Sequence, residues 1–223
     1  MTEKRNTKGF VGLIIAGVLS IIVALGALGF FQFYQTADNL YNKGNIFGEV
    51  PMKDEAVTAV KITGYAENPI ATIDGGTKLY LIEFTKTDND DFGYASLEVK
   101  EGDKLIEKLK STDDLVANPV IVAAKMRKSG ADGAVRNYTS EFKATIRENE
   151  NISKLAETDY YVSVYEFDKD RQFAYIVAGI AGIIALVFFY SAFATRKSED
   201  KAYNELYSTY PELNYSMDSV LED

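Results

Sequence analysis

The chain has 223 residues, a net charge of -9, and no cysteine, histidine or tryptophan. The lack of cysteine excludes a disulfide framework, a thiolate zinc site and an iron–sulfur cluster, and the lack of histidine excludes Ser-His-Asp and HExxH catalytic sites. An acidic chain without a basic stripe also lacks the cations that neutralise phosphates, so we expect no nucleic-acid partner.

Two long apolar runs dominate the sequence. Residues 10–34 contain no charged side chain, and as a helix they would measure about 37 Å, more than the roughly 30 Å of a hydrocarbon core. Residues 172–195 form a second uncharged run. We therefore predict two transmembrane helices and a lipid bilayer as partner. A cleaved signal peptide with a small-x-small site at residues 27–29 is the alternative to the first span, although its apolar region should be shorter, about 7–15 residues.

Basic residues flank both spans on the side of the chain termini. They are Lys4, Arg5 and Lys8 before the first span, and Arg196, Lys197 and Lys201 after the second. The positive-inside rule then places both termini in the cytoplasm. The predicted layout is a cytoplasmic tail (1–9), a first span (10–34), an extracytoplasmic domain (35–171), a second span (172–195) and an acidic cytoplasmic tail (196–223) in the cell membrane.

Small residues recur along both spans. Candidate helix-packing residues at spacings of about four are Gly12, Ala16, Ser20 and Ala24 in the first span, and Ala174, Ala178 and Gly182 in the second. Small side chains let helices approach closely in lipid, which favours a packed hairpin or a face for a partner's helices. The competing interpretation is that Gly and Ala are simply common in spans. Neither span contains an ionisable residue, which argues against a transporter or channel that works alone.

The part between the spans reads as a mixture of strands and helices. Predicted strands are 56–62, 69–73, 78–86, 94–100, 118–125 and 159–168, and predicted helices are 101–111 and 135–148. The turn signal around Gly75 predicts a hairpin between the second and third strands. This order predicts an α+β domain in which one sheet curls against one or two helices, similar to a small OB-like barrel. Before it, residues 35–48 should continue the first helix and break at Gly44.

Acidic residues supply the remaining candidates for chemistry. The loop with Asp88, Asn89, Asp90 and Asp91 offers oxygen ligands, but it lacks the bidentate acid that ends an EF-hand loop, so an ordinary turn is the better interpretation. Carboxylates at Glu83, Glu98, Asp113 and Asp114 are expected on solvated strand faces and loops. We expect no catalytic residue, no cofactor and no metal ligand.

The tail is predicted to begin as a helix, and one of its segments also enters a resemblance to a known family. Tyr203, Leu206 and Tyr210 have helical spacing, and Pro211 should end that helix. With two spans around a small domain, the segments GYAENP (64–69), KLYLIEF (78–84) and YNELYSTYPEL (203–213) resemble a family of uncharacterised bacterial two-span membrane proteins of Firmicute type. The resemblance implies an extracytoplasmic α+β domain, and it implies no activity and no catalytic residue.

These features favour a non-enzymatic integral membrane protein. We expect an accessory or scaffold subunit of a bacterial envelope complex, with an outer domain for protein–protein interaction and a membrane-protein partner or a second copy as its partner. The alternative is a membrane sensor whose outer domain binds a small ligand or cation. A third hypothesis, an enzyme that uses acids alone, requires a cleft with two facing carboxylates.

Overall fold

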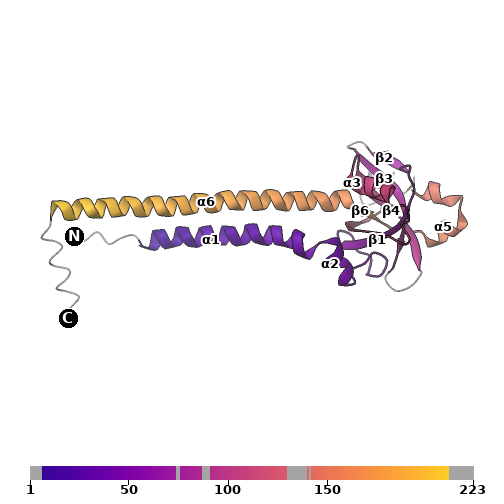
Figure 1. Cartoon of the computed structure of the whole chain (residues 1–223), viewed down its shortest axis with the longest axis horizontal. Coiled ribbons are helices and arrows are strands. Elements are labelled where there is room, and N and C mark those ends of the chain that lie inside the picture. Colours follow the sequence, from indigo (N-terminus) through magenta and orange to yellow (C-terminus); the bar gives the residue numbers. More distant parts are fainter. Residues whose placement is uncertain (1–6, 74–75, 87–90, 130–139, 141, 211–223) are drawn as a thin grey trace. The chain divides into compact units, whose positions relative to one another are not determined.

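The computed structural model describes residues 7–73, 76–86, 91–129, 140 and 142–210 (Figure 1). The chain divides into two compact units, residues 29–174 and the segments that precede and follow them. The first unit is a mixed α/β domain that contains a closed barrel. The second consists of two long apolar helices.

The barrel has five strands, and a sixth short strand extends its edge. The strands are β1 Val57–Tyr65, β2 Ala71–Ile73, β3 Thr77–Thr85, β4 Phe92–Lys100, β5 Val120–Lys128 and β6 Tyr160–Ser163. Their order is β1-β5-β6-β4-β3-β2, and an additional β1–β3 pairing closes the barrel. All neighbours are antiparallel except β4 and β6, which run parallel. The predicted β2–β3 hairpin is confirmed by the pairing of Ile73 with Thr77.

Alternation of side chains along the strands builds the core inside the barrel. Leu97 and Val99 on β4 and Met126 on β5 are fully buried in one cluster with residues from the other strands. Phe47, which precedes β1, joins this cluster and packs edge-on against Phe84, with 4.9 Å between ring centroids. The interior is therefore filled by apolar side chains, as expected for a small barrel.

Short helices pack against the barrel. Helix α3, Lys104–Ser111, begins at Asp103, whose carboxylate accepts a hydrogen bond from the Leu105 backbone N–H at 2.8 Å. Its buried residues Leu105 and Leu109 belong to the barrel core, and the helix predicted for residues 101–111 is confirmed. Residues 142–147 are helical, and helix α5, Glu150–Leu155, follows. Of the predicted helix at 135–148, residues 140 and 142–147 are thus helical, and residues 135–139 and 141 lie outside the described residues.

The chain enters the barrel through a broken helix. Helix α1, Thr7–Gly29, continues as a π-helical turn η1, Phe30–Tyr34, and ends there. A separate helix α2, Ala37–Asn42, starts at Thr36, whose hydroxyl accepts from the Asn39 N–H at 3.2 Å. The predicted continuation to Gly44 was thus wrong, because a threonine cap interrupts the helix eight residues earlier. Gly44 does adopt the left-handed backbone of a turn, with φ of 72°.

The second long helix begins earlier than predicted. Helix α6 runs from Val164 to Thr209 without interruption, so the strand predicted for 159–168 is in fact a four-residue strand followed directly by helix. The apolar run 172–195 is only the middle of α6. Its last turns carry the helical spacing predicted for the tail, and α6 ends two residues before Pro211.

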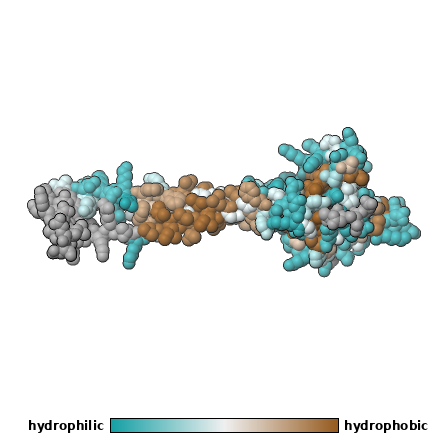
Figure 2. All heavy atoms as spheres, turned by 60° about the horizontal axis from the view of Figure 1, so that its bottom comes forward, coloured by the Kyte–Doolittle hydropathy of each residue, from teal (hydrophilic) through white to brown (hydrophobic). Residues whose placement is uncertain are grey.

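Helices α1 and α6 are each long and apolar enough to cross a membrane. Large apolar side chains on both are exposed, among them Leu25 at 63% and Leu186 at 70%. Figure 2 shows the corresponding brown surface over the two helices. In water such a continuous apolar surface would be unfavourable, and in a bilayer it is the normal exterior of a span.

Candidate functional site: the junction between the barrel and helix α6

The barrel passes into the second long helix without a linker. Strand β6 ends at Ser163 and helix α6 begins at Val164. The Ser163 hydroxyl oxygen accepts a hydrogen bond from the Glu166 backbone N–H at 2.9 Å, so Ser163 caps the helix. A serine cap satisfies one of the N–H groups that a helix leaves unpaired at its start. One residue therefore belongs to the barrel sheet and to the start of the helix at once.

Three polar residues lie side by side across the strands at this point. In the sheet register, Ser163 is opposite Glu98 on parallel β4 and opposite Lys125 on antiparallel β5. The chain neighbours of Glu98 and Lys125 belong to the interior core, so these two side chains point to the outer face of the barrel. They are nevertheless only 7% and 6% exposed, and Ser163 is fully buried.

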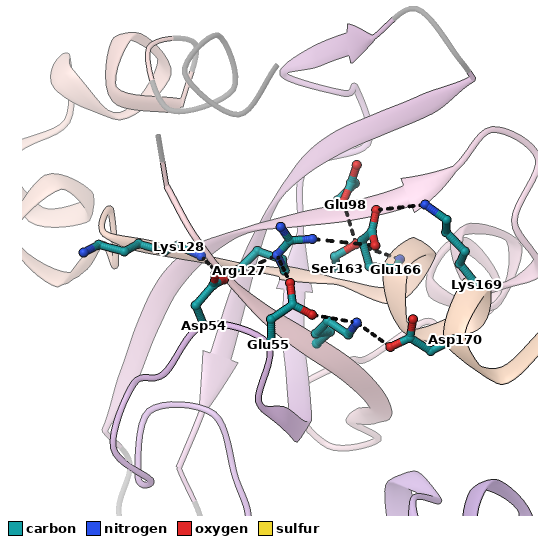
Figure 3. Close-up of polar contacts among 10 residues, drawn as sticks. Asp54, Glu55, Glu98, Arg127, Lys128, Ser163, Glu166, Lys169 and Asp170 are labelled. Carbon is teal, nitrogen blue, oxygen red and sulfur yellow. Dashed lines mark hydrogen bonds and ion pairs between the residues drawn. The ribbon is translucent and has the colours of Figure 1, made fainter. Parts of the chain in front are cut away.

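Ion pairs from three segments cover this row (Figure 3). The Lys125 ammonium contacts Glu55 Oε2 at 2.9 Å and also pairs with Asp170 on α6. Arg127 on β5 places Nε 3.1 Å from Glu55 Oε1, and its Nη1 lies 3.6 Å from Glu166 Oε2 on α6. The first two turns of α6 are thus bonded to the barrel by charge.

The loop before β1 completes the network. Asp54 Oδ1 lies 3.3 Å from Arg127 Nε and accepts a hydrogen bond from the Lys128 backbone N–H at 2.8 Å. Glu55 adopts a left-handed backbone with φ of 67°, unusual for a residue with a side chain. Its N–H donates to the Met126 carbonyl at 2.9 Å. From this position the Glu55 carboxylate contacts both Lys125 and Arg127 of β5.

Burial and neighbouring polar groups together set the pKa values of Lys125 and Glu98. Burial alone lowers the pKa of Lys125, but hydrogen bonds to Asp170 and Glu55 outweigh it, and the net effect raises the pKa. For Glu98, burial raises the pKa, and the nearby Glu166 raises it further, against hydrogen bonds from Ser163 and Thr77 and the charge of Arg127. Lys125 is therefore held in its charged form, whereas the ionised form of Glu98 is disfavoured.

Comparison with known proteins gives no relative from which a role could be carried over. No family model, no curated protein and no solved structure matches the chain. Its function has to be argued from its own residues.

The predicted helix-packing residues of the first span occupy different environments. Ala24 is buried in one cluster with Ala178 and Ala181 of α6. Ala16 and Ser20 are half-buried, and the Ser20 hydroxyl donates to the Ala16 carbonyl of its own helix at 2.9 Å. Gly12 is exposed and has open space where a Cβ would be.

Gly17, which is not among the predicted helix-packing residues, is buried in this unit. A Cβ added at Gly17 would lie 2.9 Å from Cζ of Phe189 on α6. On α6, Ala178 is buried with Ala24, whereas Ala174 and Gly182 are half-buried and Gly182 has open space around its Cβ position. Whether this face also binds a partner's helices stays a prediction.

Of the acids expected on solvated surface, one is placed differently. Asp113 and Asp114 are exposed, and Glu83 is half-buried and accepts from the Thr63 hydroxyl at 3.1 Å. The expectation for Glu98 was wrong, because this side chain is only 7% exposed and lies beside Ser163 and Glu166 where α6 begins. Asp88, Asn89 and Asp90 lie outside the described residues. Among those described, no three acids are grouped so that they could hold a metal ion.

The junction was not predicted from the sequence, although one signal for it was present. Ser163 and Glu166 form the S-x-x-E pattern that marks a helix start. It predicts a helix from Val164, inside the segment that was interpreted as strand. No comparable signal marks Lys125 and Arg127, because basic residues at the end of a strand usually face water.

Proposed function

We propose that the chain is a non-enzymatic, two-span membrane protein that holds a small barrel at the outer surface of the membrane as an accessory or scaffold subunit. The observation that carries this proposal is the junction, since strand β6 continues directly into the apolar helix α6. Ion pairs fix the first turns of that helix to the barrel. An attachment of this kind suits the presentation of a surface to a neighbouring membrane protein.

The orientation follows from the flanking charges. We place both termini in the cytoplasm and the barrel outside, because Lys8 precedes the first apolar run and Arg196 and Lys197 follow the second. The Arg196 guanidinium lies 5.0 Å from the centre of the Phe10 ring. A cation and an aromatic ring at the same end of the helix pair suit the interface between lipid and water.

The orientation predicts a labelling pattern. The chain has no native cysteine, so single cysteines report cleanly at exposed Glu67, which follows β1, and at exposed Lys201 in α6. A membrane-impermeant maleimide added to intact cells should label the Glu67→Cys chain and not the Lys201→Cys chain, and both should react in opened cells. Labelling of Lys201→Cys alone in intact cells would show that the orientation is inverted.

The strand order of the barrel bears on its fold type, and a purification experiment tests its interaction role. We propose that it is OB-like, because it has five strands closed in the order β1-β5-β6-β4-β3, with α3 between β4 and β5. A fold alone does not set a function. Purification in mild detergent after crosslinking in cells should recover the chain with a membrane-protein partner or a second copy. Repeated recovery of the lone monomer contradicts the scaffold role.

A second candidate function is a sensor. It is favoured by the same junction, because any change in the barrel near Glu98 or Lys125 acts on side chains that contact the first turns of α6. In a scaffold this coupling is incidental. In a sensor it is the path by which an event outside reaches the membrane helices.

A further inference from the structure

Glu98 occupies an unusual position for a carboxylate. It lies on the outer face of the barrel, yet it is only 7% exposed. Its Oε2 accepts a hydrogen bond of 2.5 Å from the Ser163 hydroxyl (Figure 3). The same hydroxyl accepts from the Glu166 N–H at 2.9 Å. A chain of two hydrogen bonds therefore connects a buried acid of the barrel with the first turn of α6.

The groups that face Glu98 come from four elements. Thr77 on β3 and Ser163 on β6 donate hydrogen bonds, Arg127 on β5 contributes a positive charge, and Glu166 on α6 a negative one. The nearest cations are already shared, since Arg127 pairs with Asp54, Glu55 and Glu166, and Lys125 pairs with Glu55 and Asp170. With Lys169, which pairs with Glu166 at 4.0 Å, three cations among the described residues thus serve five acids, counting Glu98, and the junction holds an excess of negative charge when all are ionised.

We propose that this junction is a proton-responsive joint, in which uptake of a proton by Glu98 tightens the attachment of α6 to the barrel and loss of that proton loosens it. Protonation removes the repulsion between Glu98 and Glu166 and the cost of a buried charge. The hydrogen bond to Ser163 persists, because a neutral carboxyl still accepts through its carbonyl oxygen. The proposal gives the sensor role a ligand, the proton, but the joint would respond to pH whether or not the barrel binds a partner.

The sign follows from linkage. When the joint opens, Glu98 meets water and its pKa returns to its ordinary value of 4.5, whereas in the closed joint it is raised. The closed joint therefore binds more protons than the open one at any pH between these two values. Its stability is greatest below that window and falls as the pH rises through it.

The test is hydrogen exchange of the full chain in lipid nanodiscs, with mass spectrometry of peptides that cover the first turns of α6. After correction for the intrinsic dependence of exchange on pH, protection of the Glu166 amide in the wild type should fall several-fold between pH 4.5 and about pH 8. Unchanged protection over this range overturns the proposal, and this measurement needs no mutation.

Two variants assign the effect. Glu98→Gln, a neutral side chain of the same shape, should give protection that no longer falls with pH. Glu83→Gln is the matched control, because Glu83 also accepts from a strand hydroxyl, that of Thr63, but has no contact with α6 among the interactions described; it should keep the wild-type dependence. A wild-type dependence in Glu98→Gln overturns the assignment to Glu98. None of these outcomes depends on a partner, so failure of the scaffold role is separately visible.

Discussion

Replacement of Lys125 by glutamate should unfold the junction and destabilise the barrel by about 3–5 kcal/mol, the usual effect of breaking a buried ion pair. Lys125 is 6% exposed and its ammonium contacts Glu55 and Asp170. In the Lys125→Glu chain, three carboxylates would meet where the ammonium now lies, and the contact of Arg127 with the other oxygen of Glu55 would not offset their repulsion. The change is measured by denaturant unfolding of the full chain in mild detergent, followed by near-ultraviolet circular dichroism of the buried Tyr80 and Tyr161.

Two further variants separate charge from burial. Lys125→Met keeps the apolar stem and removes the charge, and we expect a smaller loss of about 1–3 kcal/mol, because the freed carboxylates of Glu55 and Asp170 are half exposed and can be hydrated. Lys78→Met is the matched control. Lys78 is also on a barrel strand and pairs with Glu101 at 2.6 Å, but at the surface and away from α6, so its loss should change little.

A double-mutant cycle tests whether Lys125 acts through the helix. Combining Lys125→Met with Asp170→Asn should give a coupling energy of about 0.5–3 kcal/mol, since the two side chains are in direct contact. A coupling near zero would mean that Lys125 matters only to the barrel. Of the ion pairs between the barrel and α6, only that of Arg127 with Glu166 would then hold the helix.

The strands were predictable because their signals are local. In β4, apolar and polar side chains alternate from Ala95 to Lys100, and β3 is rich in aromatic and branched residues. The Asp-Gly-Gly sequence before β3 predicted its pairing with β2, which the structure contains. The closure of the barrel was not predictable, because the pairs β1–β5 and β4–β6 join residues that are 58 to 68 positions apart in the sequence. No local pattern encodes such pairs, and only the comparison with a known barrel type suggested them.

The junction was missed for a different reason. The segment Tyr160–Phe167 carries β-branched and aromatic residues, which favour a strand, and Ser163 was not recognised as a cap. Burial of Glu98 and Lys125 could not be predicted either, since on their own strands they alternate with core residues as exposed residues do. They are covered only because α6 starts immediately after β6 and folds over their face, which is a tertiary effect.

The packing face of the spans shows the same limit. Residues with a spacing of four drift around a helix by about 40° at each step, so Gly12 and Ala24 lie about 120° apart. Gly17 and Ala24 are seven apart and lie within about 20° of one face. On α6 the buried alanines Ala178, Ala181 and Ala185 follow the same three-and-four spacing. The small residues of the sequence therefore predicted that α1 and α6 pack together. Their angular positions around each helix decide which of them lie in the contact.

Replacement of Gly17 by leucine should therefore separate α1 from α6, whereas the same change at Gly12 should have little effect. A Cβ at Gly17 alone would lie 2.9 Å from the Phe189 ring, and nothing lies within 4 Å of a Cβ at Gly12. Both changes add the same apolar volume to the same helix, so they differ only in the face that carries it. The readout is a cysteine pair, Ala24→Cys with Ala178→Cys, in this cysteine-free chain.

In native membranes, a short thiol crosslinker should join the cysteine pair efficiently in the parent chain and in the Gly12→Leu chain. Its yield should fall several-fold in the Gly17→Leu chain, because close packing of small residues is what holds helices together where lipid removes the hydrophobic drive. An equal loss of crosslinking yield in both variants would mean that the face with Gly12 contributes to the contact as much as the face with Gly17. Equal retention would mean that Phe189 can rotate away, and that Ala24, Ala178 and Ala181 suffice to hold the pair.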